Sequence, residues 1–240
     1  MSKQSLQGKV AVVVGASSGM GRATAVSYAN AGAKVVVAAR SQAALEALAS
    51  EVGDDVIVQP TDTQDVSAVD ALIDKTLQTF GSIDILVYAT GTNIPDRSLE
   101  RLTHETWDMM LATNATGAFN CTKAVLPAMQ KQKQGLIIYI SSVSAKRADV
   151  SGVAYQASKH ALTGLAHGTY LEEKENGIRT SIVFPGLCDT PLVLKRPVVT
   201  PEDVLAKALQ PEDVADACLY LASAPSRVRV GELVMEPAGL

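Results

Sequence analysis

Residues 153–162 read VAYQASKHAL and place a phenol, Tyr155, four positions before an ammonium, Lys159. On a helix this spacing stacks the two side chains on one face, one turn apart. A phenol has a pKa of about 10 and is a poor acid or base near neutral pH. A neighbouring ammonium stabilises the phenolate and lowers that pKa. The pair therefore indicates either a site that moves a proton or an ordinary pair on a helix surface.

A hydroxyl group lies upstream of this pair, in IYISSVS at residues 138–144. Ser142 stands where an apolar run ends, and its hydroxyl can orient a substrate carbonyl by hydrogen bonding. Serine-rich turns are also common structural features, so this residue gains weight only beside Tyr155 and Lys159. A serine hydrolase is not indicated, because the chain has no nucleophile elbow and none of its three histidines fits a triad pattern.

A glycine-rich segment, GASSGMG at residues 15–21, joins the apolar run KVAVVVGA to a helical pattern. Glycines permit a tight turn and a close approach of the backbone to phosphate, and the helix N-terminus favours negative charge. Because the segment lies at the first junction of strand and helix, it predicts a dinucleotide site. Its spacing differs from the general nucleotide-binding fingerprint. The predicted contacts are Gly15, Ser17, Ser18, Gly19, Met20 and Gly21.

The ends of the next two predicted strands bear on cofactor choice. A NAD enzyme usually carries an acid about 20 residues beyond the glycines, for the ribose 2′-hydroxyl. Here Ala39 takes that position, followed by Arg40 and Ser41. A guanidinium can bind a 2′-phosphate, so we predict NADP(H) in preference to NAD(H). In PTDTQD, Asp62 beside Thr63 can accept a hydrogen bond from adenine, or it can cap the following helix.

Apolar runs alternate with helical periods along the chain. The predicted strands are 9–16, 34–40, 55–60, 83–90, 135–141, 178–186 and 231–235, and the longest predicted helices are 104–129 and 153–176. This alternation over short connections implies right-handed crossovers and a parallel sheet. We predict one α/β domain over residues 1–240, a doubly wound sheet of about seven strands flanked by helices. Residues 186–211 form the longest stretch without a clear element and predict a substrate loop.

Composition narrows the class of protein. The chain has 240 residues, 47% of them hydrophobic, and a net charge of −4, which does not attract nucleic acid. It has no apolar run of about 18 residues and no small-residue cleavage site, so neither a membrane span nor a signal peptide is expected. The three cysteines fit neither a disulfide framework nor a zinc site. We expect a cytoplasmic protein without a metal.

Taken together, the sequence resembles the short-chain dehydrogenase/reductase family over nearly its whole length. The matching positions are Gly15, Gly19 and Gly21 in the glycine motif, Asn114 in ATNATGAF, Ser142, Tyr155 and Lys159, and Pro185, Gly186 and Thr190 after the sixth strand. The resemblance implies further cofactor contacts at Ala89, Thr90, Gly91, Tyr155, Lys159, Pro185, Gly186, Cys188 and Thr190.

The resemblance also implies a catalytic role for four residues. Tyr155 is then the general acid in reduction and the base in oxidation, and Lys159 tunes it while binding ribose hydroxyls. Ser142 positions the reacting oxygen. Asn114 holds a water in the proton relay, or it simply kinks its helix. The hydride comes from the cofactor.

Two departures from the family pattern stand out. YATG at residues 88–91 puts Tyr88 and Ala89 where the family has two amide side chains, which predicts an effect on local stability rather than on chemistry. The C-terminus GELVMEPAGL lacks the usual Asp-Gly-Gly, and this weakens the expectation of a homotetramer. A homodimer through helices 104–129 and 153–176 is the other expectation.

The substrate residues expected beside Ser142 and Tyr155 are Ile94 and Leu187, within walls from 92–97, 143–151 and 186–200. The apolar side chains favour a hydrophobic ketone or aldehyde. Two cations nearby, Lys146 and Arg147, suit an anionic carrier or a carboxylate instead.

We expect an NADP(H)-dependent carbonyl reductase or alcohol dehydrogenase acting on a small molecule. A 3-oxoacyl-thioester reductase is the enzyme alternative. An NADP-binding sensor or interaction module is the alternative without catalysis. A nucleotide-sugar epimerase is disfavoured, because 240 residues leave little room for a longer substrate domain.

Overall fold

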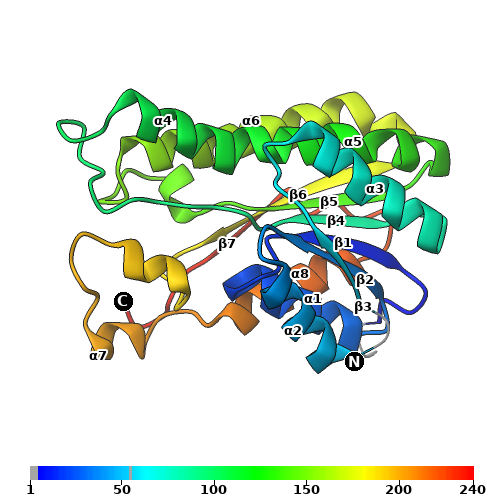
Figure 1. The fold of residues 1–240 in the computed structure, drawn as a ribbon, viewed down its shortest axis with the longest axis horizontal. Coiled ribbons are helices and arrows are strands. Elements are labelled where there is room, and N and C mark those ends of the chain that lie inside the picture. The colour runs from blue at the N-terminus through cyan, green and yellow to red at the C-terminus, as the bar shows by residue number, and fades with distance from the viewer. Residues whose placement is uncertain (1–4, 54–55) are drawn as a thin grey trace.

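The computed structural model describes residues 5–53 and 56–240. Seven parallel strands form one sheet in the order β3-β2-β1-β4-β5-β6-β7 (Figure 1). Their bounds are β1 Val10–Val14, β2 Lys34–Ala39, β3 Val56–Pro60, β4 Ile85–Tyr88, β5 Gly135–Ile140, β6 Ile178–Pro185 and β7 Glu232–Met235. The α/β prediction is confirmed, and each predicted strand is present with shorter ends. Residue 55 of the predicted third strand lies outside the described residues.

Helices cover both faces of this sheet (Figure 1). One face carries α1 Gly19–Asn30, α2 Gln42–Val52 and α8 Pro211–Ser223, and the other carries α3 Val66–Phe80, α4 His104–Leu111, α5 Gly117–Gln132 and α6 Val153–Glu173. A hydrophobic core lies on each face of the sheet, and successive β1 residues point into opposite cores. Val13 packs in the cluster with α1, and Val12 packs in the cluster with α3 and α5. Burial on both faces explains the uninterrupted apolar runs.

The predicted helix 104–129 is not continuous. A π-helical turn, Ala112–Thr116, separates α4 from α5. Gly117 begins α5 at a point where a Cβ would lie 2.4 Å from Thr63 Oγ1 and 2.5 Å from the Tyr88 hydroxyl. One widened turn does not change the apolar periodicity enough to be recognised, so the sequence pattern predicted a single helix.

The predicted substrate loop at 186–211 contains short elements of its own. They are a 3₁₀ turn, Pro191–Lys195, and α7, Glu202–Leu205. A parallel bridge between Cys188 and Leu209 closes the base of the segment. The segment extends beyond one end of the sheet, near the C-terminus (Figure 1). Among the helices the structure describes, none is both long and apolar enough to cross a membrane.

Candidate functional site

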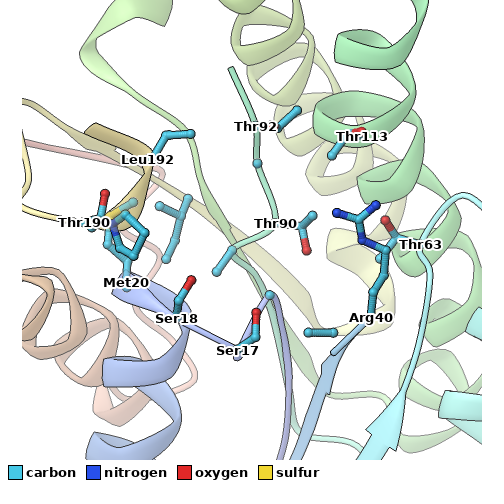
Figure 2. Close-up of a pocket in the computed structure, with 18 of the residues that line it drawn as sticks. Ser17, Ser18, Met20, Arg40, Thr63, Thr90, Thr92, Thr113, Thr190 and Leu192 are labelled. Carbon is cyan, nitrogen blue, oxygen red and sulfur yellow. The ribbon is translucent and has the colours of Figure 1, made fainter. Parts of the chain in front are cut away.

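Two cavities lie beyond the carboxyl ends of the strands. The first, here the glycine-loop cavity, has a volume of about 310 Å³ and is bordered by residues 15–21, the ends of β2 and β4, and α6 (Figure 2). The second, here the serine cavity, has a volume of about 120 Å³ and is lined by Ser142, Ser144 and Ser151. Tyr155 lines both cavities. The phenol therefore stands where the contents of the two cavities would meet.

The glycine loop is built for close backbone packing. Gly15 has φ +90°, and a Cβ there would lie 2.7 Å from the Ala89 carbonyl carbon. A Cβ at Gly21 would lie 2.3 Å from the Gly15 carbonyl oxygen. Ser18, the N-cap of α1, makes no side-chain cap, and the first turn has no acidic residue. The first backbone N–H groups of α1 thus face the cavity uncapped, which suits a phosphate.

The end of β2 presents Arg40 to this cavity. Its side chain extends on the same side of the cavity as Thr63 (Figure 2). Arg40 is exposed and has no ion-pair partner among residues 5–53 and 56–240. Ser41 also lines the cavity, and its hydroxyl caps α2 by accepting from Ala44 N.

Asp62 lines the glycine-loop cavity and does not cap a helix. Asp65 caps α3 instead, with its Oδ1 accepting hydrogen bonds from Ser67 N and Ala68 N. The Oδ1 atom of Asp62 accepts from Gln64 N at 3.0 Å. The capping alternative for Asp62 is therefore wrong, because the helix begins later than the sequence pattern indicated.

The other predicted cofactor residues lie around both cavities. Ala89, Thr90 and Gly91 line the glycine-loop cavity, Pro185, Gly186 and Cys188 line the serine cavity, and Thr190 lines both. The first cavity is also lined by residues that were not predicted as cofactor contacts: Thr61, Gln64, Thr92, Thr113, Ile140, Ser141, Pro191, Leu192 and Lys195. Four of them belong to the predicted substrate walls: Thr92, Pro191, Leu192 and Lys195. Lys195 donates from Nζ to Thr92 Oγ1 at 2.8 Å and so joins the 186–211 segment to the loop after β4. No motif in the sequence distinguished these residues from ordinary loop positions.

Lys159 is buried one turn beyond Tyr155 on α6. Its Nζ donates to the Ile140 carbonyl oxygen at 3.0 Å and lies 5.8 Å from the centroid of the Tyr155 ring. Burial lowers the pKa of the Lys159 ammonium to about 8. A Cβ at Gly91 would lie only 3.0 Å from this Nζ, so the glycine leaves the space that the ammonium occupies.

Tyr155 is protonated at neutral pH in this structure. Burial raises the pKa of its phenol to about 12, while the Ser142 hydroxyl and the guanidinium groups of Arg97 and Arg196 act in the lowering direction. Asp149 acts in the raising direction. The sequence predicts that Lys159 lowers the pKa of Tyr155, but in the structure the groups that lower it are the Ser142 hydroxyl and the two arginines. A neutral phenol is the form that donates a proton.

Ser142 stands at the head of a chain of hydroxyl groups. Its Oγ donates to Ser144 Oγ at 3.1 Å, and Ser144 Oγ donates to Asp149 Oδ2 at 2.6 Å. Ser151 Oγ lies 3.0 Å from Ser144 Oγ, and its backbone N–H donates to Asp149 Oδ1. The chain fixes the Ser142 hydroxyl beside the phenol.

Asn114 lies in the middle of the π-helical turn and is fully buried. Its Oδ1 accepts from Thr92 N at 2.7 Å, and its Nδ2 donates to Thr92 O and to Ser158 Oγ. The amide therefore clamps the loop after β4 to α6. Asn114 is not among the described residues that line either cavity.

Tyr88, which stands where the family has an amide side chain, is buried and hydrogen-bonded. Its hydroxyl donates to the Thr113 carbonyl oxygen at 2.6 Å, inside the π-helical turn and next to Asn114. Burial is the main cause that raises the pKa of this phenol, so it stays a donor. Tyr88 therefore holds the segment that carries Asn114, so its effect on local stability is exerted next to the site.

The substrate prediction needs revision in detail. Leu187 lines the serine cavity, but Ile94 is not among the described residues that do so. Lys146 pairs with Glu232 and Arg147 pairs with Glu236, so both expected cations are neutralised at β7. Polar residues from the three predicted walls, which the sequence did not single out, line the cavity: Asn93, Arg97, Asp149 and Arg196. They lie in loops, where no periodic pattern indicated which way they face.

Comparisons with known proteins agree with this geometry. Residues 9–197 match the family model described as short chain dehydrogenase. An uncharacterized oxidoreductase of Staphylococcus haemolyticus is 35% identical over 233 residues, covering 97% of this chain and 98% of the relative.

Two solved structures share the fold along almost the full length. A 3-ketoacyl-(acyl-carrier-protein) reductase from Brucella melitensis, complexed with NADH, has a TM-score of 0.91 at 28% identity and covers 98% of this chain and 99% of its own. An alcohol dehydrogenase from the archaeon Thermococcus sibiricus, complexed with 5-hydroxy-NADP, has a TM-score of 0.84 at 29% identity and covers 96% of this chain and 97% of its own.

The parallel sheet with its glycine loop is a Rossmann-type fold, which binds a nicotinamide cofactor, and the family match and the relatives make the chain an oxidoreductase. The chain belongs to the short-chain dehydrogenase/reductase family.

Proposed function

We propose that this protein transfers a hydride between NADP(H) and the carbonyl or alcohol carbon of a small molecule. The observation that carries the proposal is the position of Tyr155, which lines both the glycine-loop cavity and the serine cavity. A cofactor in the first and a substrate in the second would meet at a buried, protonated phenol. When bound, the cofactor supplies the hydride.

Each remaining step belongs to a residue of this chain. In reduction the Tyr155 hydroxyl donates its proton to the substrate oxygen, and in oxidation the phenolate takes it back. The Ser142 hydroxyl, which donates to Ser144 Oγ in the absence of substrate, turns to donate to the same oxygen. Lys159, anchored on Ile140 O, presents its remaining N–H groups to the ribose of the nicotinamide. Asn114 holds the loop after β4 in place for this arrangement.

The preference for NADP(H) is part of the proposal. Arg40 faces the glycine-loop cavity and has no acidic partner in the described chain. The residue before it, Ala39, occupies the position where an acid would repel a 2′-phosphate. The relatives with known cofactors include both an NADH complex and an NADP-type complex, so the preference rests on Arg40.

We also propose a homodimer or homotetramer in the cytoplasm. The outer faces of α5 and α6 leave Phe119 and Leu171 exposed. A large hydrophobic side chain exposed on each of two neighbouring helices suits a contact between copies.

A thioester reductase is the second candidate, and the Brucella melitensis relative favours it. The serine cavity, at about 120 Å³, is small for a long acyl chain. Both candidates use Tyr155 in the same way, so the substrate panel below separates them.

The test is NADPH consumption with ketones, aldehydes, quinones, sugars and acetoacetyl thioesters, using the native chain and Tyr155→Phe. We expect turnover with at least one carbonyl compound, and a loss of about 10³-fold or more in Tyr155→Phe because the phenylalanine has no proton to donate. The variant should still bind NADPH, measured by the change in cofactor fluorescence. Near-normal turnover in Tyr155→Phe would remove this residue from the reaction. NADPH binding without any turnover in the native chain would favour the sensor.

A further inference from the structure

Two guanidinium groups line the serine cavity together with Ser142 and Tyr155. Arg97 comes from the loop after β4, and Arg196 follows the 3₁₀ turn Pro191–Lys195. Both groups lie close enough to Tyr155 to influence its phenol. Two positive charges thus converge on the reacting end of the cavity from segments far apart in the sequence.

Neither guanidinium has a matched negative charge. Within residues 5–53 and 56–240, no ion pair joins Arg97 or Arg196 to a carboxylate. The Nε atom of Arg97 is buried without a hydrogen-bond partner. Arg196 donates from Nη1 to Thr200 Oγ1 at 3.2 Å. A buried donor without a partner carries a desolvation cost that a bound acceptor removes.

Three other cations near these loops are paired with acids. Arg101 pairs with Asp96 at 3.2 Å, and Lys146 and Arg147 pair with glutamates of or beside β7. Lys195 forms no ion pair in the described chain either, but its Nζ donates to Thr92 Oγ1 at the edge of the glycine-loop cavity. Among the described residues that line the serine cavity, Arg97 and Arg196 are the two cations, and both are unpaired.

Asp149 is the acid among the described residues that line the cavity, and its charge acts on Arg97 without forming an ion pair with it. Its Oδ2 accepts from Ser144 Oγ and its Oδ1 accepts from Ser151 N. The Asp149 carboxylate is thus hydrogen-bonded to the serines, and its one negative charge is outnumbered by the two positive charges of Arg97 and Arg196. The cavity keeps a net positive charge beside the phenol.

We propose that the substrate carries a carboxylate, held by Arg97 and Arg196 while Ser142 and Tyr155 hold the reacting oxygen. The substrate class is a short oxo acid or the matching hydroxy acid. This inference rests on the proposed function and specifies its substrate. A carboxylate matches the planar fork of a guanidinium, and the cavity volume of about 120 Å³ suits a chain of few carbon atoms.

The reaction needs only NADPH and a proton from water. In reduction the carbonyl carbon gains the hydride of NADPH, the carbonyl oxygen gains the Tyr155 proton, and the phenolate left on Tyr155 regains a proton from water. The carbon–oxygen double bond becomes a single bond, and NADPH is oxidised to NADP⁺. The carboxylate does not change and serves only to bind and orient.

The experiment compares each acid with a neutral molecule of nearly the same shape. NADPH oxidation is measured with oxo acids of three to five carbons and with their amides, for example acetoacetate against acetoacetamide. Dihydroxyacetone phosphate and an acetoacetyl thioester complete the panel. The native chain is compared with Arg97→Met, Arg196→Met and a matched control, Arg101→Met, which changes an exposed arginine of the same loop.

We expect the native chain to favour an acid over its amide by about tenfold or more in kcat/KM. Arg97→Met and Arg196→Met should each lower the ratio of kcat/KM for the acid to kcat/KM for the amide by about tenfold or more, mainly through KM for the acid. The ratio is the readout because any effect of either arginine on the Tyr155 phenol acts on both compounds alike. Arg101→Met should leave this ratio unchanged. NADPH binding by each variant shows that it is folded.

The outcomes separate this inference from the proposed function. Equal rates with acids and amides in the native chain would overturn the carboxylate inference and leave the proposed function standing, whatever the variants do. Preference for dihydroxyacetone phosphate would replace the carboxylate by a phosphate. Activity confined to the thioester would also overturn the inference. No turnover with any compound would overturn the proposed function itself.

Discussion

Arg40 is the residue on which cofactor preference depends, because it brings a positive charge to the rim of the glycine-loop cavity. Arg40→Asp should raise KM for NADPH by about tenfold or more, since charge-assisted hydrogen bonds to a phosphate contribute about 1.5–3 kcal/mol. The same change should lower KM for NADH, because a carboxylate can bind the ribose 2′-hydroxyl. Steady-state kinetics with both cofactors measure the switch.

Arg227→Asp is the control for that switch. It makes the same charge change at an exposed position that is not among the described residues lining the cavities. An unchanged ratio of NADPH to NADH efficiency in Arg40→Asp would contradict the assignment of the 2′-phosphate to Arg40.

The π-helical turn between α4 and α5 is the element that links Tyr88 to Asn114. Tyr88→Phe removes the hydrogen bond to the Thr113 carbonyl oxygen and leaves a buried acceptor without its donor. We expect a stability loss of about 1–2 kcal/mol and a severalfold fall in kcat, because the turn then holds the loop after β4 less firmly.

A buried tyrosine on the next strand provides the control for Tyr88. Tyr139 on β5 hydrogen-bonds Thr122 at 2.7 Å. Tyr139→Phe should lose comparable stability in urea unfolding but keep kcat. Equal kcat losses in the two variants would show that the effect of Tyr88 is only structural.

Much of the fold could be predicted because each parallel strand is covered on both faces and therefore reads as an apolar run. The glycine loop and the Tyr155–Lys159 spacing were equally visible, because their chemistry depends on local sequence. The sequence predicted that residues 92–97 and 186–200 wall one site, but not that Arg97 and Arg196 are the cations that face it, because side-chain direction in loops follows no periodic pattern. Lys146 looked like a better candidate by position, but its partner, Glu232, is far away in sequence.

At the scale of the whole molecule, burying Lys159 has a cost in stability. Its pKa falls from 10.5 to about 8 on folding, so between these values the unfolded chain binds more protons than the folded one. The contribution of Lys159 to the free energy of unfolding therefore rises with pH from about 8 to 10.5. Below pH 8 the buried ammonium destabilises the fold by up to about 3 kcal/mol, before the hydrogen bond to Ile140 O is counted.

Lys159→Met tests this cost. We expect the variant to be more stable than the native chain at pH 7, and its advantage to shrink between pH 8 and 10, measured by urea unfolding without cofactor. The difference between the two proteins is the quantity to follow, because Cys121, Cys188 and Cys218 titrate in the opposite sense. Burial raises the pKa of these thiols, which lowers stability above pH 9 in both proteins. A constant difference over this range would contradict a depressed pKa for Lys159.

The strand order has a consequence for how the chain folds during synthesis. β1 pairs with β2 on one side and with β4 on the other, yet β4 begins at Ile85. A ribosome adding about 5–20 residues per second leaves the second edge of β1 open for several seconds. That edge is the strand VAVVV, all of whose residues are buried in the finished protein. Until residues 85–88 emerge, this strand is the segment most prone to pair with another chain, and a chaperone would protect it first.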